Sequence, residues 1–158
     1  MATKKKLLQA AAGSAGGAGL DVDDVFSTFL YEGNGSTRTI TNGIDLSGEG
    51  GMVWIKNRSI ADYHSITDTT QAYDSNYSAY ARGFTNATSA FGAHSVGGVS
   101  SFNANGFSIN TGNSEWNSSG DDFVSWTFRK APKFFDIVTY SGNSTNRTIS
   151  HNLGTTVG

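Results

Sequence analysis

The most strongly patterned stretch of the sequence is Asp122-Phe123-Val124-Ser125-Trp126-Thr127-Phe128-Arg129-Lys130. Successive residues of an extended chain point to opposite sides, so one face carries Val124, Trp126 and Phe128, and the other carries Phe123, Ser125, Thr127 and Arg129. Pro132, the only proline in the chain, follows closely and has no N–H to donate to a sheet, so the strand ends before it. The stretch predicts a strand in the centre of a sheet.

Shorter runs of strand-forming residues precede it, separated by clusters of Gly, Asn, Asp and Ser. The expected strands are Val25–Tyr31, Arg38–Thr41, Met52–Asn57, Tyr63–Thr67, Val99–Phe102 and Phe107–Asn110. Met52–Asn57 is expected to pair with Tyr63–Thr67. The last two strands are expected to form a hairpin through Asn103-Ala104-Asn105-Gly106, whose Asn and Gly tolerate positive φ. Residues 68–98 are expected to form long loops with one or two short strands.

The composition agrees with an all-β fold. Gly, Ser, Thr and Asn make up 70 of the 158 residues, and these residue types disfavour long helices. The 10 Phe, 6 Tyr and 3 Trp residues are enough large side chains to fill a core, which a disordered chain would lack. We therefore expect a folded all-β protein, preceded by a different kind of N-terminal segment.

That N-terminal segment, residues 1–20, reads as a short helix over Thr3–Ala12 followed by a flexible tether, Gly13–Gly19. A helix of this length is marginal alone in water and orders by packing against something else. We expect a docking arm whose contact residues are Lys4, Lys5, Lys6, Leu7, Leu8 and Gln9. The alternative is a frayed terminus with a solvated basic start.

An internal repeat is the most informative feature of the chain. Phe26, Tyr31, Gly33, Asn34, Arg38, Thr39 and Ile40 recur in one register, without a gap, as Phe135, Tyr140, Gly142, Asn143, Arg147, Thr148 and Ile149. Each copy reads as a strand, a Gly-Asn turn and a second strand, that is, an opening hairpin. The period, from position 26 to position 135, has the size of a β-sandwich domain and exceeds that of solenoid repeats.

The repeat divides the chain into three parts: a docking helix and linker at 1–20, a β-sandwich module at 21–132, and the start of a second, truncated module of the same type at 133–158. A lone hairpin is marginal in water. The second copy is therefore expected either to pack back on the first module or to open a further module of a longer protein, and we favour the second arrangement.

Several segments together resemble tail-fibre and other virion proteins of marine bacteriophages. The resemblance is carried by the segments Val22–Tyr31 leading into Gly33-Asn34-Gly35, Gly51–Lys56, Phe102–Phe107 and Val124–Pro132, and by the Lys-rich start. It implies tandem concanavalin A-like (jelly-roll) modules on a long, commonly trimeric fibre chain. The N-terminal part of such a fibre is fixed to tail, adaptor or nozzle proteins, and distal parts meet the host surface. This chain departs from the pattern by stopping after one module and a quarter.

Charge and residue types argue against several functions. A net charge of −2 and a pI of about 5.8 do not favour nucleic-acid binding, and no stretch is apolar enough to insert into a membrane. There is no cysteine and no Gly-x-Ser-x-Gly elbow.

His64, His94 and His151 are too scattered for a metal motif. A glycosidase needs two carboxylates that face a cleft. Glu32, Glu49 and Glu115 lie in Gly/Asn turns, which give no reason to expect two of them to face each other. Asp21, Asp23, Asp24, Asp121 and Asp122 lack the spacing of a calcium loop. We expect no enzyme activity, no cofactor and no metal site.

Aromatic side chains in the predicted loops are the remaining candidates for binding. Tyr73, Tyr77, Tyr80 and Trp116 are expected either to stack on sugars or a neighbouring subunit, or to be buried in their own sandwich. The resemblance implies a homo-oligomeric, trimeric fibre protein of the virion tail that binds a tail protein and attaches to the host. The alternative is a carbohydrate-binding adhesin module.

Overall fold

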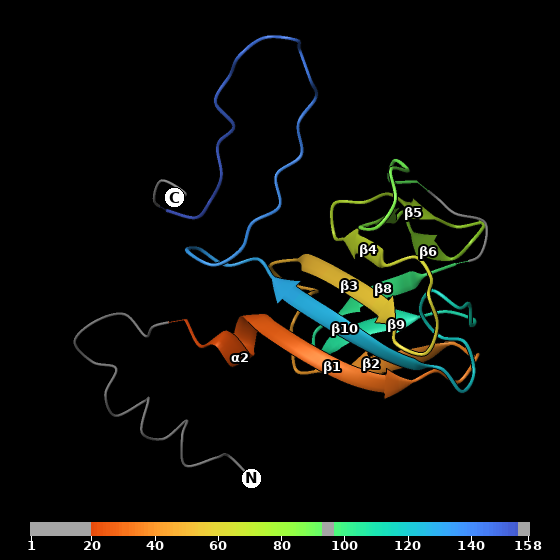
Figure 1. Cartoon of the computed structure of the whole chain (residues 1–158). Helices are drawn as coiled ribbons and strands as arrows, with labels where there is room; N and C mark the ends of the chain where they lie inside the picture. The colour runs from red at the N-terminus through yellow and green to blue at the C-terminus, as the bar shows by residue number, and fades with distance from the viewer. Residues whose placement is uncertain (1–19, 93–96, 155–158) are drawn as a thin grey trace, which may run out of the picture.

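The computed structural model describes residues 20–92 and 97–154 of the chain and shows an all-β protein (Figure 1). The strands are β1 (Phe26–Glu32), β2 (Arg38–Thr41), β3 (Gly51–Asn57), β4 (Ser65–Asp68), β5 (Tyr73–Asp74), β6 (Ala79–Tyr80), β7 (Gly83–Phe84), β8 (Val99–Asn103), β9 (Gly106–Ile109) and β10 (Asp122–Arg129). All pairings between these strands are antiparallel.

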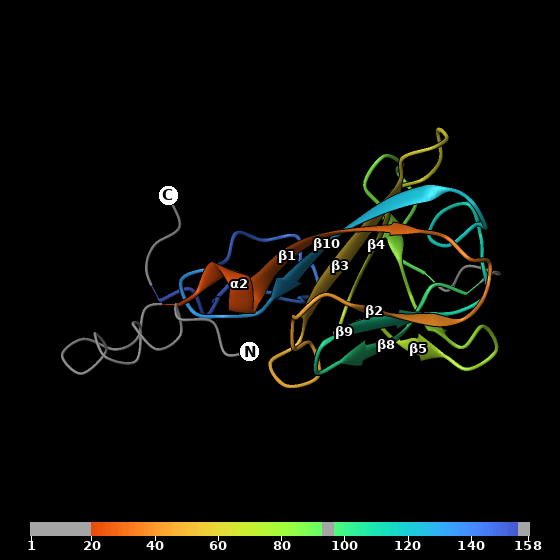
Figure 2. The same cartoon turned by 90° about the horizontal axis from the view of Figure 1, so that it is seen from below.

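The strands form two sheets that pack face to face, as the edge-on view in Figure 2 shows. The larger sheet has the order β1-β10-β3-β4-β7, the smaller has the order β2-β9-β8, and β5 and β6 form a separate ribbon. β10 lies between β1 and β3, which confirms the interior position expected for it. β3 pairs with β4, and β8 with β9, so both of these hairpins are confirmed.

The alternation of side chains sorts each strand of the larger sheet into two faces. In β10, Phe123, Ser125 and Thr127 are fully buried, whereas Trp126 and Phe128 are partly exposed. In β3, Val53 and Ile55 are buried, and Trp54 is partly exposed. The inward face therefore carries Phe, Val, Ile and small polar residues, and the large tryptophans lie on the outside.

The core lies between the two sheets and joins residues from both. Its buried members are Tyr31, Ile40, Ile44, Leu46, Val53, Ile55, Val99, Phe107, Ile109, Trp116 and Phe123, with Phe29 and Phe102 packed against them. Tyr31 stacks on Phe123 with ring centroids 5.3 Å apart, and its hydroxyl donates to the carbonyl of Trp116 at 2.6 Å. Burial raises the pKa of the Tyr31 hydroxyl above its ordinary value, which the nearby Arg38 opposes only in part.

The predicted opening hairpin of the first copy is wrong. β1 pairs with β10 in the larger sheet and β2 pairs with β9 in the smaller, so the Gly-Asn segment crosses from one sheet to the other. Tyr31 on β1 and Ile40 on β2 are both buried in the core, which the two strands cover from opposite sheets. A short Gly-rich connection is compatible with either arrangement, and the pairing of β1 with β10 and of β2 with β9 selects the crossing.

The second copy also differs from its expected hairpin. Apart from an isolated bridge between Ala131 and Phe135, residues 130–154 contain no strand. Phe134 and Phe135 contact Phe128 of β10, and the part of the segment that follows stands away from the sandwich in Figure 1. Its backbone has no neighbouring strand to pair with among the described residues. The second copy resembles the first in sequence, but in the described part of the chain it lacks neighbouring strands like β9 and β10, with which the first copy pairs.

Three further local features complete the fold. Residues 68–92 are rich in loops, as expected, but contain three short strands, β5, β6 and β7, where one or two were predicted. The sequence did not predict the helix α2 (Val22–Val25), which Asp21 caps by accepting the N–H of Asp23 at 3.2 Å. The predicted helix Thr3–Ala12 and its docking residues lie outside the described residues.

Candidate functional site

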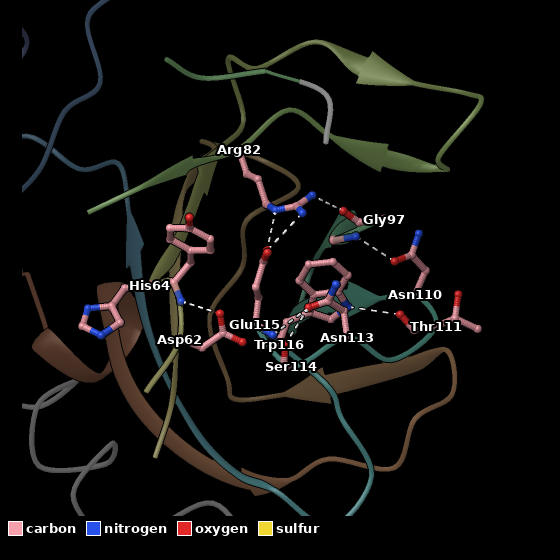
Figure 3. A network of polar contacts seen from close by, with 12 residues as sticks. Asp62, His64, Arg82, Gly97, Asn110, Thr111, Asn113, Ser114, Glu115 and Trp116 are labelled. Atoms are coloured by element: carbon pink, nitrogen blue, oxygen red, sulfur yellow. Dashed lines mark hydrogen bonds and ion pairs between the residues drawn. The ribbon is translucent and has the colours of Figure 1, made fainter. Parts of the chain in front are cut away.

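The loop that connects β9 to β10 carries a dense network of polar contacts, shown in Figure 3. The side-chain oxygen of Asn113 accepts a hydrogen bond from the N–H of Glu115 at 2.9 Å. The backbone carbonyl of Asn113 accepts hydrogen bonds from the N–H groups of Trp116 and Asn117. These bonds wind the loop into a single turn. The turn directs the side chains of Glu115, Trp116 and Asn117 into the end of the sandwich, where all three are buried.

Arg82 and Glu115 form a buried ion pair in this network. The Nη2 and Nε atoms of Arg82 lie 3.0 and 3.1 Å from Oε2 of Glu115, and Nη1 donates to the carbonyl of Gly97. The guanidinium also lies 4.5 Å from the centre of the Trp116 ring. Burial lowers the pKa of Arg82, and the Glu115 carboxylate counteracts this by favouring the charged form.

This network is suited to holding loops together rather than to chemistry on a ligand. Arg82 is 2% exposed and Glu115 is 9% exposed, so both charges face each other inside the protein. The sequence gives little sign of the pair, because Arg82 and Glu115 lie 33 residues apart in loop-like segments. Glu115 does lie in a turn, as predicted, but the turn is buried and pairs it with an arginine.

Buried asparagines join the neighbouring loops in the same way. Asn57 Nδ2 donates to the carbonyl of Ser114 at 2.8 Å and to Asp121 Oδ2 at 3.0 Å, while its Oδ1 accepts the N–H of Ser59. Asn117 bonds both the backbone and the side chain of Asn34 at 3.1 Å. Part of the high Asn content therefore stabilises loops.

The four aromatic candidates separate into two environments. Trp116 is fully buried, so the alternative of burial within its own sandwich is the correct one for this residue, and it is not accessible to a sugar. Tyr73 is 50% exposed and meets Tyr80 edge-on at 5.2 Å, and Tyr80 in turn contacts Phe102 at 4.8 Å. Tyr77 lies in the β5–β6 turn, with its carbonyl held by Asn110 Nδ2. We call Tyr73, Tyr80 and Phe102, whose rings contact one another, the tyrosine patch.

A second apolar surface lies on the outer face of the larger sheet. Trp54 and Trp126 are directly opposite each other in the β3–β10 pairing, with ring centroids 4.8 Å apart. Leu30, on the neighbouring strand β1, is 59% exposed. Strand alternation predicts that Trp126 and Trp54 each share a face with their neighbours two residues away, but it does not show which face is outside.

The repeat is visible in the local geometry of the two copies. The side chain of Asn34 accepts the N–H of Ser36, and that of Asn143 accepts the N–H of Thr145. Arg38 donates to the carbonyl of Glu32 and lies over the Tyr31 ring, and in the second copy Arg147 donates to the carbonyl of Ser141 and lies over the Tyr140 ring. The N–H of Ile44 donates to the side chain of Asn42, and that of Leu153 donates to the side chain of His151. Gly35 and Ser144, at corresponding positions, both have positive φ.

The two copies differ in what surrounds them. The exposed fraction of Tyr31 is 7%, and that of Tyr140 is 66%. The first copy pairs with β9 and β10, whereas residues 136–154 are in no ladder. The second copy thus keeps the local turn geometry of the first without its neighbours.

The remaining candidates do not come together. Asp21 caps α2, Asp121 accepts from Asn57, and no group of three or more His, Asp or Glu residues in the described ranges is arranged to hold a metal ion. His64 is partly exposed, His151 is exposed, and His94 lies outside the described residues. Within the described part, no helix is long and apolar enough to cross a membrane.

Comparison with known proteins adds the family. Neither the curated proteins nor the solved structures give a match to this chain. A family model described as a domain of unknown function, DUF7483, matches residues 21–158, which begin beside α2 and include both copies of the repeat. The match covers all of the sequence after Leu20, so the chain belongs to the DUF7483 family.

Proposed function

We propose that this protein is a structural protein of a bacteriophage virion, the N-terminal portion of a tail fibre built from tandem β-sandwich modules. In this proposal residues 21–132 are one module of the concanavalin A-like, jelly-roll type, and residues 133–158 begin the next. The fibre is a homotrimer in the virion tail. Its task is attachment, without enzymatic chemistry, cofactor or metal.

The observation that carries the proposal is the repeat. The segments that begin at Phe26 and at Phe135 share seven identities and the same local hydrogen bonds, which is the pattern of a chain assembled from copies of one module. The resemblance to marine bacteriophage fibre proteins supports the virion assignment. The two packed antiparallel sheets are compatible with the module type that the resemblance implies.

The N-terminal residues supply the attachment to the tail in this proposal. Lys4, Lys5, Lys6, Leu7, Leu8 and Gln9 bind a tail, adaptor or nozzle protein, and the glycine-rich stretch allows several subunits of an oligomer to bind at once. The first strand begins at Phe26, so removal of residues 1–19 leaves every strand in place.

Deletion of residues 1–19 tests this function. The truncated protein is expected to melt at the same temperature as the full chain and to be absent from purified virions, as measured by mass spectrometry of the particles. A full-length variant with Ile60→Ala, whose side chain is 48% exposed between β3 and β4, is the control for tolerance of an exposed change. Normal incorporation of the truncated chain would contradict the proposal.

A second candidate function, carbohydrate binding, is supported by the tyrosine patch. Aromatic rings that are partly exposed and held against one another give an apolar surface on which sugar rings stack. A glycan array probed with the purified chain should show binding that Tyr73→Ala abolishes and that Tyr63→Ala, at a 48% exposed tyrosine outside the patch, does not. Binding unchanged by Tyr73→Ala would reject the patch, and an empty array would reject this candidate.

A further inference from the structure

The apolar side chains of the second copy are exposed or partly exposed at the positions where those of the first copy are buried. Tyr31, Ile40 and Ile44 are 7%, 1% and 0% exposed. At the corresponding positions Tyr140 is 66% exposed, and Ile149 and Leu153 are partly exposed. The second copy therefore presents, in the same order, the apolar side chains that the first copy inserts into a core.

The first copy shows what kind of surface covers these side chains. Tyr31 stacks on Phe123 and donates to the carbonyl of Trp116, and the N–H of Gly33 donates to the carbonyl of Asp121 at 2.8 Å. The backbone of β1 pairs along β10, and that of β2 pairs along β9, with Ile40 opposite Phe107. The covering surface thus consists of one edge of β10, one edge of β9 and the turn that precedes β10.

A glycine at corresponding positions of the two copies, Gly33 and Gly142, indicates that the second copy could lie as close to a neighbouring backbone as the first copy does. A Cβ on Gly33 would lie 2.0 Å from the carbonyl oxygen of Ser118, so the close contact permits only glycine there. A Cβ on Gly142 would have nothing within 4 Å. Nothing in the described surroundings of Gly142 requires a glycine, whereas a neighbour placed as Ser118 is placed at Gly33 would require it.

The corresponding surface of this chain is already occupied. β10 is paired with β1 on one side and β3 on the other, and β9 is paired with β2 and β8. A second copy of this chain therefore offers no free edge at the required place, unless its own first copy is displaced. The partner must be a sandwich body that lacks its own opening strands.

We propose that residues 135–153 are a docking segment that completes a second sandwich body of this fold, adding one strand beside the counterpart of β10 and one beside the counterpart of β9. The occupant is the body of a further module, equivalent to residues 45–129 here. On docking, Tyr140, Ile149 and Leu153 take the places of Tyr31, Ile40 and Ile44. This inference rests on the tandem-module part of the proposed function.

A graft within the full chain tests the fit directly. The segment Tyr31–Ile44 is replaced by the sequence of Tyr140–Leu153, which has the same length and differs from it at eight positions. The chimera is expected to fold, with dispersed amide NMR signals and one cooperative melting transition. A control graft with the same residues in scrambled order is expected to lose both.

Two half-grafts keep the test decisive if the long graft does not fold. One carries Glu32→Ser, Gly35→Ser, Ser36→Thr and Thr37→Asn, and the other carries Thr41→Ser, Asn42→His, Gly43→Asn and Ile44→Leu. Each is expected to melt cooperatively. Failure of either half-graft overturns the docking segment. The outcome is independent of virion incorporation, so a folded graft with a normally incorporated deletion of 1–19 would reject the fibre function and keep the docking segment.

Discussion

Arg82 is the residue whose environment allows the sharpest prediction. Its guanidinium is enclosed between Glu115, the Gly97 carbonyl and the Trp116 ring. Arg82→Met leaves the Glu115 carboxylate buried without its cation, which costs about 3–5 kcal/mol. The free energy of unfolding in urea is expected to fall by that amount.

The double variant Arg82→Met, Glu115→Leu is the control, because it removes both charges and keeps comparable volume. It should recover much of the loss, since burying an ion pair is itself expensive. A double variant that is less stable than Arg82→Met alone would contradict this prediction, because it would show that the loss does not come from leaving the Glu115 carboxylate buried without a cation.

The two glycines of the repeat provide a matched pair. Gly33→Ala forces a methyl group against the backbone oxygen of Ser118, and overpacking of this kind typically costs about 1–3 kcal/mol or more. Gly142→Ala meets open space and is expected to change stability by less than about 0.5 kcal/mol. Thermal melting of both variants checks the difference, and equal effects would contradict the described contacts of Gly33.

At the scale of elements, the strands themselves can be predicted well from alternation and turn residues. Val53 and Ile55 against Trp54 mark two faces of β3, and Asn105-Gly106 marks the β8–β9 hairpin, because such signals are local in sequence. The β1–β2 hairpin is mispredicted because the choice between pairing and crossing depends on β9 and β10, which lie far along the chain from both strands.

The contrast between local signals and contacts to distant segments also explains which site residues could be predicted. Trp116 reads as a loop aromatic, and its burial follows only from the turn around Asn113 and from Arg82 on a distant segment. The Arg82–Glu115 pair is separated by 33 residues and has no local motif. By contrast, the repeat can be found from sequence because it needs only a linear comparison, and matching local geometry accompanies it.

The segment after β10 is held at its start by Asp136. Its carboxylate accepts the N–H of Asn152 at 2.7 Å and that of Ile137 at 2.9 Å, and it lies 3.4 Å from Lys130 Nζ. The N–H of Asn152 is the largest cause that lowers the pKa of Asp136 below its ordinary value of 3.8, with smaller contributions from Ile137 and Lys130. A lowered pKa means that the stabilising contribution is present above pH 3.8 and is lost as the pH falls through the folded pKa.

The amide NMR signal of Asn152 is therefore expected to shift in a titration with a midpoint below pH 3.8. Asp136→Asn should remove this titration and leave the signals of β1 and β3 in place, because those strands make no hydrogen bond to the carboxylate. A midpoint above pH 3.8 in the unaltered chain would contradict the described hydrogen bonds.

For the whole molecule, the structure predicts that the sandwich does not need the second copy. Phe134 and Phe135 contact Phe128, but from Val138 onward the described side chains are mostly exposed. A chain ending at Ile137 is expected to melt within about 4 °C of the full chain, the shift that roughly 1 kcal/mol produces. A much larger drop would mean that residues 138–158 pack on the sandwich and form one closed domain with it.

The pairing of β1 with β10 fixes how such modules could be joined. Phe26 lies opposite Phe128, so the chain enters and leaves the sandwich side by side, and Glu32, Asn57 and Asp122 meet at the other end. Modules linked in this way would be joined through one end of each sandwich, so each sandwich would extend to the side of its junctions instead of lying end to end with its neighbours. If residues 133–158 begin a further module, as proposed above, the short junction after β10 would set the distance between consecutive sandwiches, and the end of each sandwich at Glu32 and Asp122 would lie away from the junctions.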